Sequence, residues 1–346
     1  MFGLSNSKGR VRTVWSSSVA DYVIDLAWSA DGCFLAVADS TGPVSLFDAK
    51  SGTGDLKITG HDKGTLALAW SPVAPILATA GKDRRVRLWN TAACETACLE
   101  AAANWVERLA WHPDGSMLAA AAGRTVHIWK YPGDHIADLT DHPSTVSDLA
   151  WRPHSRTLAA LVYGGVMLWT LQGDKPPSFR LFPWKGSPLR MAWSPDGSML
   201  AHGNQDSTVH FWYAETAEEL QMSGYATKVR ELSWNPTSRF LATGGGSLVC
   251  VWDCGGVGPA GTKPQMLDGH EETATLTAVQ FQSRGHLLAS ADDAGRVCVW
   301  QPANTKQPLV GMVQGEGEVA ALRWSPDDKL LAVSYSTGAV SVLAVS

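Results

Sequence analysis

The sequence predicts an all-β protein built from eight copies of one small antiparallel sheet. An aromatic residue recurs eight times at intervals of 40 to 47 residues, and a Leu-Ala pair begins seven positions after each aromatic. A fixed period of this length predicts a series of repeated supersecondary units. The aromatics are Trp28, Trp70, Trp111, Trp151, Trp193, Trp234, Phe281 and Trp324. The leucines that follow them are Leu35, Leu77, Leu118, Leu158, Leu200, Leu241, Leu288 and Leu331.

Each unit contains the pattern of three short strands separated by turns. An apolar residue stands two positions before the aromatic, so both side chains lie on one face of a first strand. Six copies carry a proline two positions after the aromatic, which favours a turn. The Leu-Ala pair begins a second strand, and a third strand ends in Val-x-apolar-Trp, as in residues 86–89 and 209–212. Polar, glycine-rich stretches between the units leave room for a fourth, outer strand.

A period near 42 residues, with an aromatic at the end of the third strand, indicates the blades of a β-propeller. The Gly-His that precedes the first strand in WD-repeat proteins stands at residues 60–61 and 269–270, and the Trp-Asp that ends the third strand stands at 252–253. Looser versions are Asp141-His142, Trp89-Asn90 and Phe47-Asp48. Residues 22–343 therefore resemble the WD-repeat (WD40-type) family, which implies a propeller fold for almost the whole chain.

The sequence predicts one ring of eight blades, with a ring of seven blades as the alternative. Seven blades are commoner in the WD-repeat family, but the eighth unit retains Trp324, Pro326, Leu331 and its third strand. That unit ends without an outer strand, whereas residues 10–15 alternate like a strand. We expect residues 10–15 to complete the last blade, because closure removes exposed sheet edges. The expected units span residues 22–60, 61–103, 104–141, 142–186, 187–226, 227–268, 269–316 and 317–346.

Composition and charge argue against several classes of protein. The chain has 28 basic and 33 acidic residues and a net charge of −5, so we expect no nucleic-acid partner. Basic residues near the N-terminus precede no apolar run, so we expect no secretory signal. No apolar stretch is long enough to span a bilayer, so we expect no membrane partner. The six cysteines form no CxxC pair and no dense framework, which favours a reducing cytoplasm.

The WD-repeat resemblance implies a structural hydrogen-bond network in some blades. In that family the network joins a His before the first strand, a Ser or Thr on the second, a turn Asp and the third-strand Trp. Unit two matches with His61, Thr79, Asp83 and Trp89. Unit seven has His270, Ser290 and Trp300, with Ala294 at the aspartate position after Asp292 and Asp293. We expect most other units to lack the network.

No motif of a catalytic or metal site occurs, so we expect no enzyme activity, no cofactor and no bound metal. Glycine loops that cradle phosphate, GxSxG and HExxH are all absent from the sequence. His127 and His210 occupy the same third-strand position in units three and five, which are too far apart to share a metal. The spacing of Cys94 and Cys98 does not fit a zinc knuckle.

The remaining candidates are large side chains on loops. In WD-repeat proteins the loops before the first strand and between the second and third strands share one rim of the ring. Tyr, Trp and Arg are the residues that most often anchor interfaces, so we expect partner binding at such positions on this rim. They are Tyr22, Arg84, Arg85, Trp105, Tyr163, Trp184, Tyr225 and Tyr335. The alternative for each of them is packing against a neighbouring loop.

Two functions of different classes follow. The first is a non-catalytic scaffold or adaptor that binds partner proteins or peptides on the rim. The second is a propeller that binds a metal or a small molecule in its central channel, with enzyme activity as one form of it, and the ten histidines motivate it. The oligomeric state, self-association included, stays open.

Overall fold

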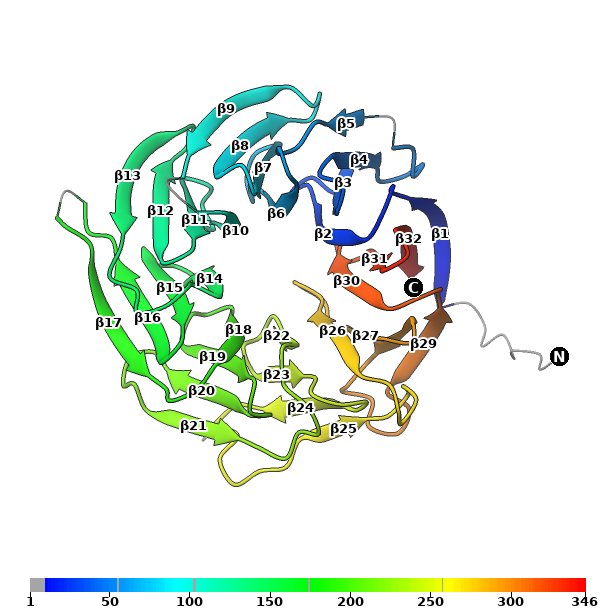
Figure 1. Cartoon of the computed structure of the whole chain (residues 1–346). Helices are drawn as coiled ribbons and strands as arrows, with labels where there is room; N and C mark the ends of the chain where they lie inside the picture. The colour runs from blue at the N-terminus through cyan, green and yellow to red at the C-terminus, as the bar shows by residue number, and fades with distance from the viewer. Residues whose placement is uncertain (1–9, 55, 102–103, 174, 257) are drawn as a thin grey trace.

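The computed structural model describes residues 10–54, 56–101, 104–173, 175–256 and 258–346. Within these residues the chain forms 32 strands in eight four-stranded antiparallel sheets. None of this part of the chain offers a helix with the length and hydropathy needed to cross a membrane. Figure 1 shows the sheets side by side around a ring, each with one strand near the centre and another at the outer edge. The predicted eight-bladed all-β propeller is therefore confirmed.

Seven blades are built from four consecutive strands, and we number them in chain order. Blade one contains β2 (Val23–Trp28), β3 (Phe34–Asp39), β4 (Val44–Asp48) and β5 (Leu56–Ile58). Blade two contains β6 (Thr65–Trp70), β7 (Ile76–Gly81), β8 (Arg85–Asn90) and β9 (Glu95–Glu100). Blade three contains β10 (Val106–Trp111), β11 (Met117–Ala122), β12 (Thr125–Lys130) and β13 (Asp134–Leu139). Blade four contains β14 (Asp148–Trp151), β15 (Thr157–Val162), β16 (Gly165–Thr170) and β17 (Ser178–Pro183).

The second half of the ring repeats this order. Blade five contains β18 (Pro188–Trp193), β19 (Met199–Asn204), β20 (Val209–Tyr213) and β21 (Glu219–Met222). Blade six contains β22 (Leu232–Trp234), β23 (Phe240–Thr243), β24 (Val249–Asp253) and β25 (Gln265–Leu267). Blade seven contains β26 (Leu276–Phe281), β27 (Leu288–Asp292), β28 (Arg296–Trp300) and β29 (Leu309–Gln314). Blade eight contains β30 (Val319–Trp324), β31 (Leu330–Tyr335), β32 (Ala339–Val345) and β1 (Val11–Ser18).

The core lies between the blades rather than inside any one of them. All six residues of β7 are buried, because both faces of this second strand are covered by neighbouring sheets. The outer strand β17, in contrast, exposes most of its residues. One buried apolar cluster joins Ile128 of blade three to Leu158 of blade four, and similar clusters join other neighbours. A blade on its own would expose these faces to water, so stability depends on the ring.

The repeated first-strand aromatic ties each blade to the blade before it. The indole Nε1 of Trp70 donates a hydrogen bond to the carbonyl of Ala27 at 3.1 Å. Equivalent bonds are made by Trp28, Trp111, Trp151, Trp193, Trp234 and Trp324. Phe281 has no indole donor, and its backbone N–H instead donates to Ser233 Oγ at 2.8 Å. The tryptophan period of the sequence is thus an inter-blade contact repeated around the ring.

The two ends of the described chain meet in blade eight. The first strand β1 pairs with β32 along its length, with one irregularity before Trp15. Trp15 is buried, its Nε1 donates to the carbonyl of Ala49 at 2.9 Å, and its ring stacks on Phe47 of blade one. Closure by an N-terminal strand is confirmed, and the seven-blade alternative is wrong. The strand ends at Ser18 rather than at residue 15, because its pairing with β32 continues to that point.

Candidate functional site

A groove on one rim of the ring lies between blades two and three. It has a volume of about 700 Å³ and is formed by the loops before β6, β10 and β14 together with the β7–β8 and β11–β12 turns. These are the two kinds of loop that the sequence places on a common rim. The lining residues are Asp62, Lys63, Lys82, Asp83, Arg84, Arg85, Asn104, Trp105, Glu107, Gly123 and Thr145. Three of the eight predicted anchors, Arg84, Arg85 and Trp105, therefore come together here.

Trp105 gives this groove its largest apolar surface. The residue stands just before β10 and is 54% exposed. The ammonium nitrogen of Lys82 lies 5.3 Å from the centre of the indole ring, which is a cation–π contact. A tryptophan exposed to this extent is a typical anchor for an interface, because it buries a large area at a low cost in side-chain entropy.

The described residues of the groove carry an excess of unpaired positive charge. The basic side chains are Lys63, Lys82, Arg84 and Arg85, and the acidic ones are Asp62, Asp83 and Glu107. Asp83 is already engaged, because it accepts hydrogen bonds from His61 at 2.7 Å and from Arg87 at 3.2 Å. Among the ion pairs of the described chain, only the exposed contact of Arg85 with Glu100, at 3.8 Å, involves one of the four cations. Carboxylates of a partner would therefore meet free cations.

A buried hydrogen-bond network in blade two holds one of the turns that form the groove. Nδ1 of His61 donates to Asp83 at 2.7 Å, its Nε2 accepts from the Thr79 hydroxyl at 2.8 Å, and Trp89 Nε1 donates to the same hydroxyl at 2.9 Å. Burial lowers the pKa of His61, although Asp83 acts to raise it. The His61 side chain is fully buried, and of the four network residues only Asp83 also lines the groove. Its role is to hold the β7–β8 turn.

Blade seven contains a second complete network, although Ala294 stands at the aspartate position seen in blade two. Nδ1 of His270 donates to Asp292 at 2.7 Å, and its Nε2 accepts from the Ser290 hydroxyl at 2.7 Å. Trp300 Nε1 donates to the same hydroxyl at 2.7 Å. The carboxylate comes from the last residue of β27 rather than from the turn that follows it. The carboxylate of this network can thus come either from the end of the second strand or from the turn that follows it.

Tyr225, a predicted rim anchor, belongs to a third network in blade six. Its hydroxyl lies 2.9 Å from the Thr243 hydroxyl and accepts a hydrogen bond from Trp252 Nε1 at 2.9 Å. Burial raises the pKa of this phenol, although both hydrogen bonds act to lower it. The prediction of a free anchor is wrong here, because the half-buried ring and its hydroxyl are used inside the blade.

Tyr335 and Trp184 also pack against other residues of the propeller instead of offering a free surface. Tyr335 is 4% exposed, and its ring covers Gly315 so closely that an added Cβ would collide with it. Burial raises the pKa of Tyr335 to about 12. Trp184 is half-buried, with its ring centre 3.8 Å from that of His210. Both predictions of exposed anchors are corrected, because these side chains fill space beside their own blades.

The sequence holds a signal that identifies two of these misplaced residues. His61, His142, Trp184 and Tyr225 each stand nine residues before the first-strand aromatic of their blade. This is the position of the network histidine, which Trp and Tyr occupy in blades five and six. In blade four, His142 accepts a hydrogen bond from Trp169 Nε1 at 3.0 Å.

Tyr22 and Tyr163 are the remaining predicted anchors, and both are accessible. Tyr22 precedes β2 of blade one and is 43% exposed, and Tyr163 lies in the β15–β16 turn of blade four and is 63% exposed. Neither of them lines the groove between blades two and three. The rim therefore offers one assembled site and two separate aromatic positions.

One cluster of potential metal ligands occurs among the described residues, and it consists of His127, His135 and Asp138. These residues lie on β12 and β13, toward the outside of blade three (Figure 1). The alternative of a metal site at the central channel therefore finds no support in the described part of the chain.

Two family models match the sequence. The model described as WD domain, G-beta repeat matches residues 54–90, 94–130, 182–213, 218–253 and 261–301, which together make up about half of the chain. The model described as anaphase-promoting complex subunit 4 WD40 domain matches residues 7–63. The matched segments lie in both halves of the ring.

Several curated proteins resemble parts of the chain. Protein HIR1 from Cryptococcus neoformans is 33% identical over 125 residues, which are 34% of this chain and 14% of HIR1. The chromatin assembly factor 1 subunit FAS2 homolog from Oryza sativa is 28% identical over 135 residues, 29% of this chain and 27% of that protein. WD repeat-containing protein 1 from Rattus norvegicus is 39% identical over 75 residues, 21% of this chain and 12% of that protein. The similarity thus spans a minor part of each relative.

A solved structure resembles the chain over nearly its whole length. The computationally designed Ika8 protein superimposes with a TM-score of 0.80, covering 95% of this chain and 98% of that one, at 20% sequence identity. At this identity the likeness supports the fold alone.

Proposed function

Because the chain belongs to the WD40-repeat family of β-propellers, we propose that it is a non-catalytic scaffold that binds a partner protein on its rim. The proposed site is the groove between blades two and three, and the proposed ligand is an acidic peptide segment with an apolar side chain. The exposed Trp105 among unpaired cations carries this proposal. One relative is named as a subunit of chromatin assembly factor 1, which fits a role within a multiprotein complex.

The two kinds of side chain in the groove have separate tasks. An apolar side chain of the partner packs on Trp105, and this buried area provides most of the affinity. Carboxylates of the partner pair with Lys63, Lys82, Arg84 and Arg85, where solvent keeps each pair weak but the summed charge speeds association. We therefore expect the association rate to fall with salt and the lifetime of the complex to depend on Trp105.

The groove is suited to binding because hydrogen bonds within the propeller hold the side of the groove that blade two forms. The His61 and Asp83 hydrogen bond fixes the β7–β8 turn that carries Arg84. Arg85 is the first residue of β8 and pairs across to β9. A partner thus loses little affinity to ordering of the propeller. The burial of His61 supports the non-catalytic part of the proposal, since that imidazole is out of reach of a substrate.

The test compares the capture of partners from a lysate of the source cells by three forms of the full chain. These are the wild type, Trp105→Ala, and the double charge reversal Arg84→Glu with Arg85→Glu. We expect each variant to recover about tenfold less of the partner, equivalent to about 1.4 kcal/mol of binding free energy. The melting temperature should stay within about 2 °C of the wild type, because these side chains are exposed.

A matched control carries two charge reversals on other loops of the same kind. Lys185 and Lys228 are exposed, precede β18 and β22, and do not line the groove. Lys185→Glu with Lys228→Glu should leave partner recovery unchanged. Equal recovery by all four proteins would contradict the proposal, and loss in the control would show that net charge rather than the groove decides binding.

We further propose that the protein works in a reducing compartment, the cytoplasm. All six cysteines are free, and burial raises the pKa of Cys298 to about 12, so this thiol stays unreactive. Fractionation of the source cells tests this, and recovery in a secreted or membrane fraction would contradict it.

A further inference from the structure

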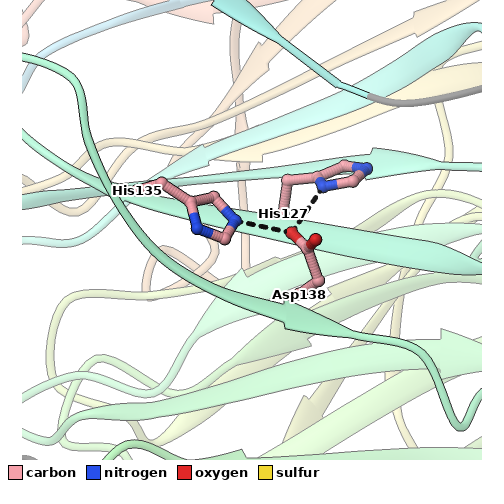
Figure 2. Close-up of side chains that lie close together, drawn as sticks. All are labelled: His127, His135 and Asp138. Carbon is pink, nitrogen blue, oxygen red and sulfur yellow. Dashed lines mark hydrogen bonds and ion pairs between the residues drawn. The ribbon is translucent and has the colours of Figure 1, made fainter.

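Three side chains on the outer half of blade three converge at one point. His127 lies on β12, and His135 and Asp138 lie on β13, the outermost strand of that blade. Figure 2 shows one carboxylate oxygen of Asp138 next to both imidazoles, 2.7 Å from Nδ1 of His127 and 2.7 Å from Nε2 of His135. The potential ligand atoms of the three residues all lie within 4.8 Å of one another.

The pairing of the two strands explains this convergence. His127 lies directly opposite Asp138, and Trp129 lies opposite His135, with an irregularity between positions 128 and 129. Opposed residues in an antiparallel pair point to the same face of the sheet. In a regular strand, positions 135 and 138 would point to opposite faces. The bulge adds one residue on β13 and thereby turns His135 to the face that holds the other two side chains.

Trp129 positions both imidazoles. Its ring is stacked on His127, with 5.7 Å between ring centres and 29° between planes, and meets His135 edge to face at 6.4 Å and 72°. His127 and Trp129 are both buried, whereas the side chains of His135 and Asp138 are about half exposed. One ligand is therefore fixed by packing, and the other two are free to adjust and lie next to solvent.

We propose that His127, His135 and Asp138 form a binding site for a zinc ion on the outer face of blade three. Two imidazole nitrogens and one carboxylate oxygen match the donor set of zinc sites that keep a position open for water or another ligand. Zinc bonds of about 2.0–2.1 Å place tetrahedral donors about 3.3 Å apart, so the Asp138 oxygen must move about 0.6 Å from each nitrogen. The exposed side chains of Asp138 and His135 permit this movement.

Zinc replaces the protons that now lie between the imidazoles and the carboxylate. When Nδ1 of His127 binds the ion, its proton moves to Nε2, which is buried and has no hydrogen-bond partner among the described residues. An N–H without an acceptor weakens the site, so we expect affinity in the micromolar rather than the nanomolar range.

Blade five provides the matched control because it carries the same third-strand histidine without the full ligand set. His210 stands at the position of His127, and its Nε2 lies 3.1 Å from Glu219. Glu219 lies opposite Trp212, as His135 lies opposite Trp129, and Gln221 lies opposite His210. A second imidazole is therefore missing at the matching positions, and we expect no zinc site there.

The test is isothermal titration of the full chain, without an affinity tag, with zinc chloride. We expect one ion per chain, and at least tenfold weaker binding in His135→Ala and in Asp138→Asn. Both substituted residues are exposed, so circular dichroism and melting should stay as in the wild type. Glu219→Gln, the control, should leave zinc affinity unchanged. Bound Co²⁺ should also give visible d–d absorption that His135→Ala removes.

Two results would overturn the proposal. One is zinc binding that is equal in the wild type, His135→Ala and Asp138→Asn, which would place the ion elsewhere. The other is no binding at millimolar zinc by a folded wild-type chain. His127→Ala is informative only if it stays folded, because its ring is buried, so the two exposed variants decide the question.

Discussion

Blade two and blade five place different residues at the same three network positions, with opposite results. In blade two, His61, Thr79 and Trp89 satisfy one another through hydrogen bonds of 2.8 and 2.9 Å. Trp184, His202 and Trp212 stand at the equivalent positions of blade five. Among the described residues, one ring nitrogen of each is buried without a hydrogen-bond partner. Blade two is held by hydrogen bonds among these three positions, whereas the three positions of blade five form none with one another.

The chemistry of the side chains explains the difference. A tryptophan can only donate, so Trp184 and Trp212 cannot bond to each other. His202 uses Nδ1 for Asn204, at 2.9 Å, and leaves Nε2 as an unused acceptor. Blade five relies on aromatic packing instead, with the ring centre of His210 3.8 Å from that of Trp184 and 5.5 Å from that of His202. A blade of this repeat can therefore be held either by a polar network or by aromatic packing. The two arrangements should respond differently to mutation and to acid.

Thr79→Val should give the largest effect. It leaves Nε2 of His61 and Nε1 of Trp89 buried without partners, at a cost of about 2–4 kcal/mol in the free energy of unfolding. Urea denaturation measures this loss. A loss below about 0.5 kcal/mol would mean that the blade-two network contributes little, and the contrast with blade five would fail.

Acid should destabilise the propeller chiefly through blade five. Burial lowers the pKa of His202 to about 3, and the nearby charge of His210 acts in the same direction. An unfolded histidine titrates near 6.5, so below that pH the unfolded chain binds a proton that the folded chain refuses. Stability is complete above pH 6.5 and falls as the pH drops toward about 3. We expect a loss of about 2 kcal/mol between pH 7 and pH 5 from this group, measured by urea midpoints.

The sequence predicted the ring more completely than it predicted the site. The Trp28 to Trp324 period and the alternating residues 10–15 were sufficient for the blades and their closure, because both are local patterns. The structure brings Arg84, Arg85 and Trp105 together at one groove, and their role in binding a partner stays a prediction. Tyr335 was misjudged because its burial depends on close packing against Gly315 in the loop before β30, which the residue type of Tyr335 alone does not reveal.

The cluster on blade three shows a second limit of the sequence. His127 and His210 look equivalent along the chain, since both precede the third-strand tryptophan by two residues. Only the bulge in β13 brings His135 beside the first of them. A bulge depends on how two strands settle into register, so the residue spacing alone did not predict it.

His202→Leu should cost about 1–2 kcal/mol at pH 7, less than Thr79→Val. The apolar side chain removes an unsatisfied acceptor and keeps most of the packing, but it leaves one buried group, Oδ1 of Asn204, without its hydrogen bond, whereas Thr79→Val leaves two. The same variant should lose part of the stability difference between pH 7 and pH 5. The rest remains, because burial also lowers the pKa of His61, His210 and His270. An unchanged acid response would show that His202 is not its main source.

The smallest effect should separate two matched tryptophan substitutions. Trp89→Phe and Trp212→Phe both remove a buried indole N–H and a similar apolar area. In blade two the change takes away a hydrogen bond to Thr79, whereas in blade five it takes away a donor that had no partner among the described residues. The shared loss of packing cancels in the difference, so Trp89→Phe should cost about 1 kcal/mol more than Trp212→Phe. Because Trp212 also stacks on Phe182, with 4.9 Å between ring centres, an equal or reversed cost would mean that stacking outweighs the hydrogen bond.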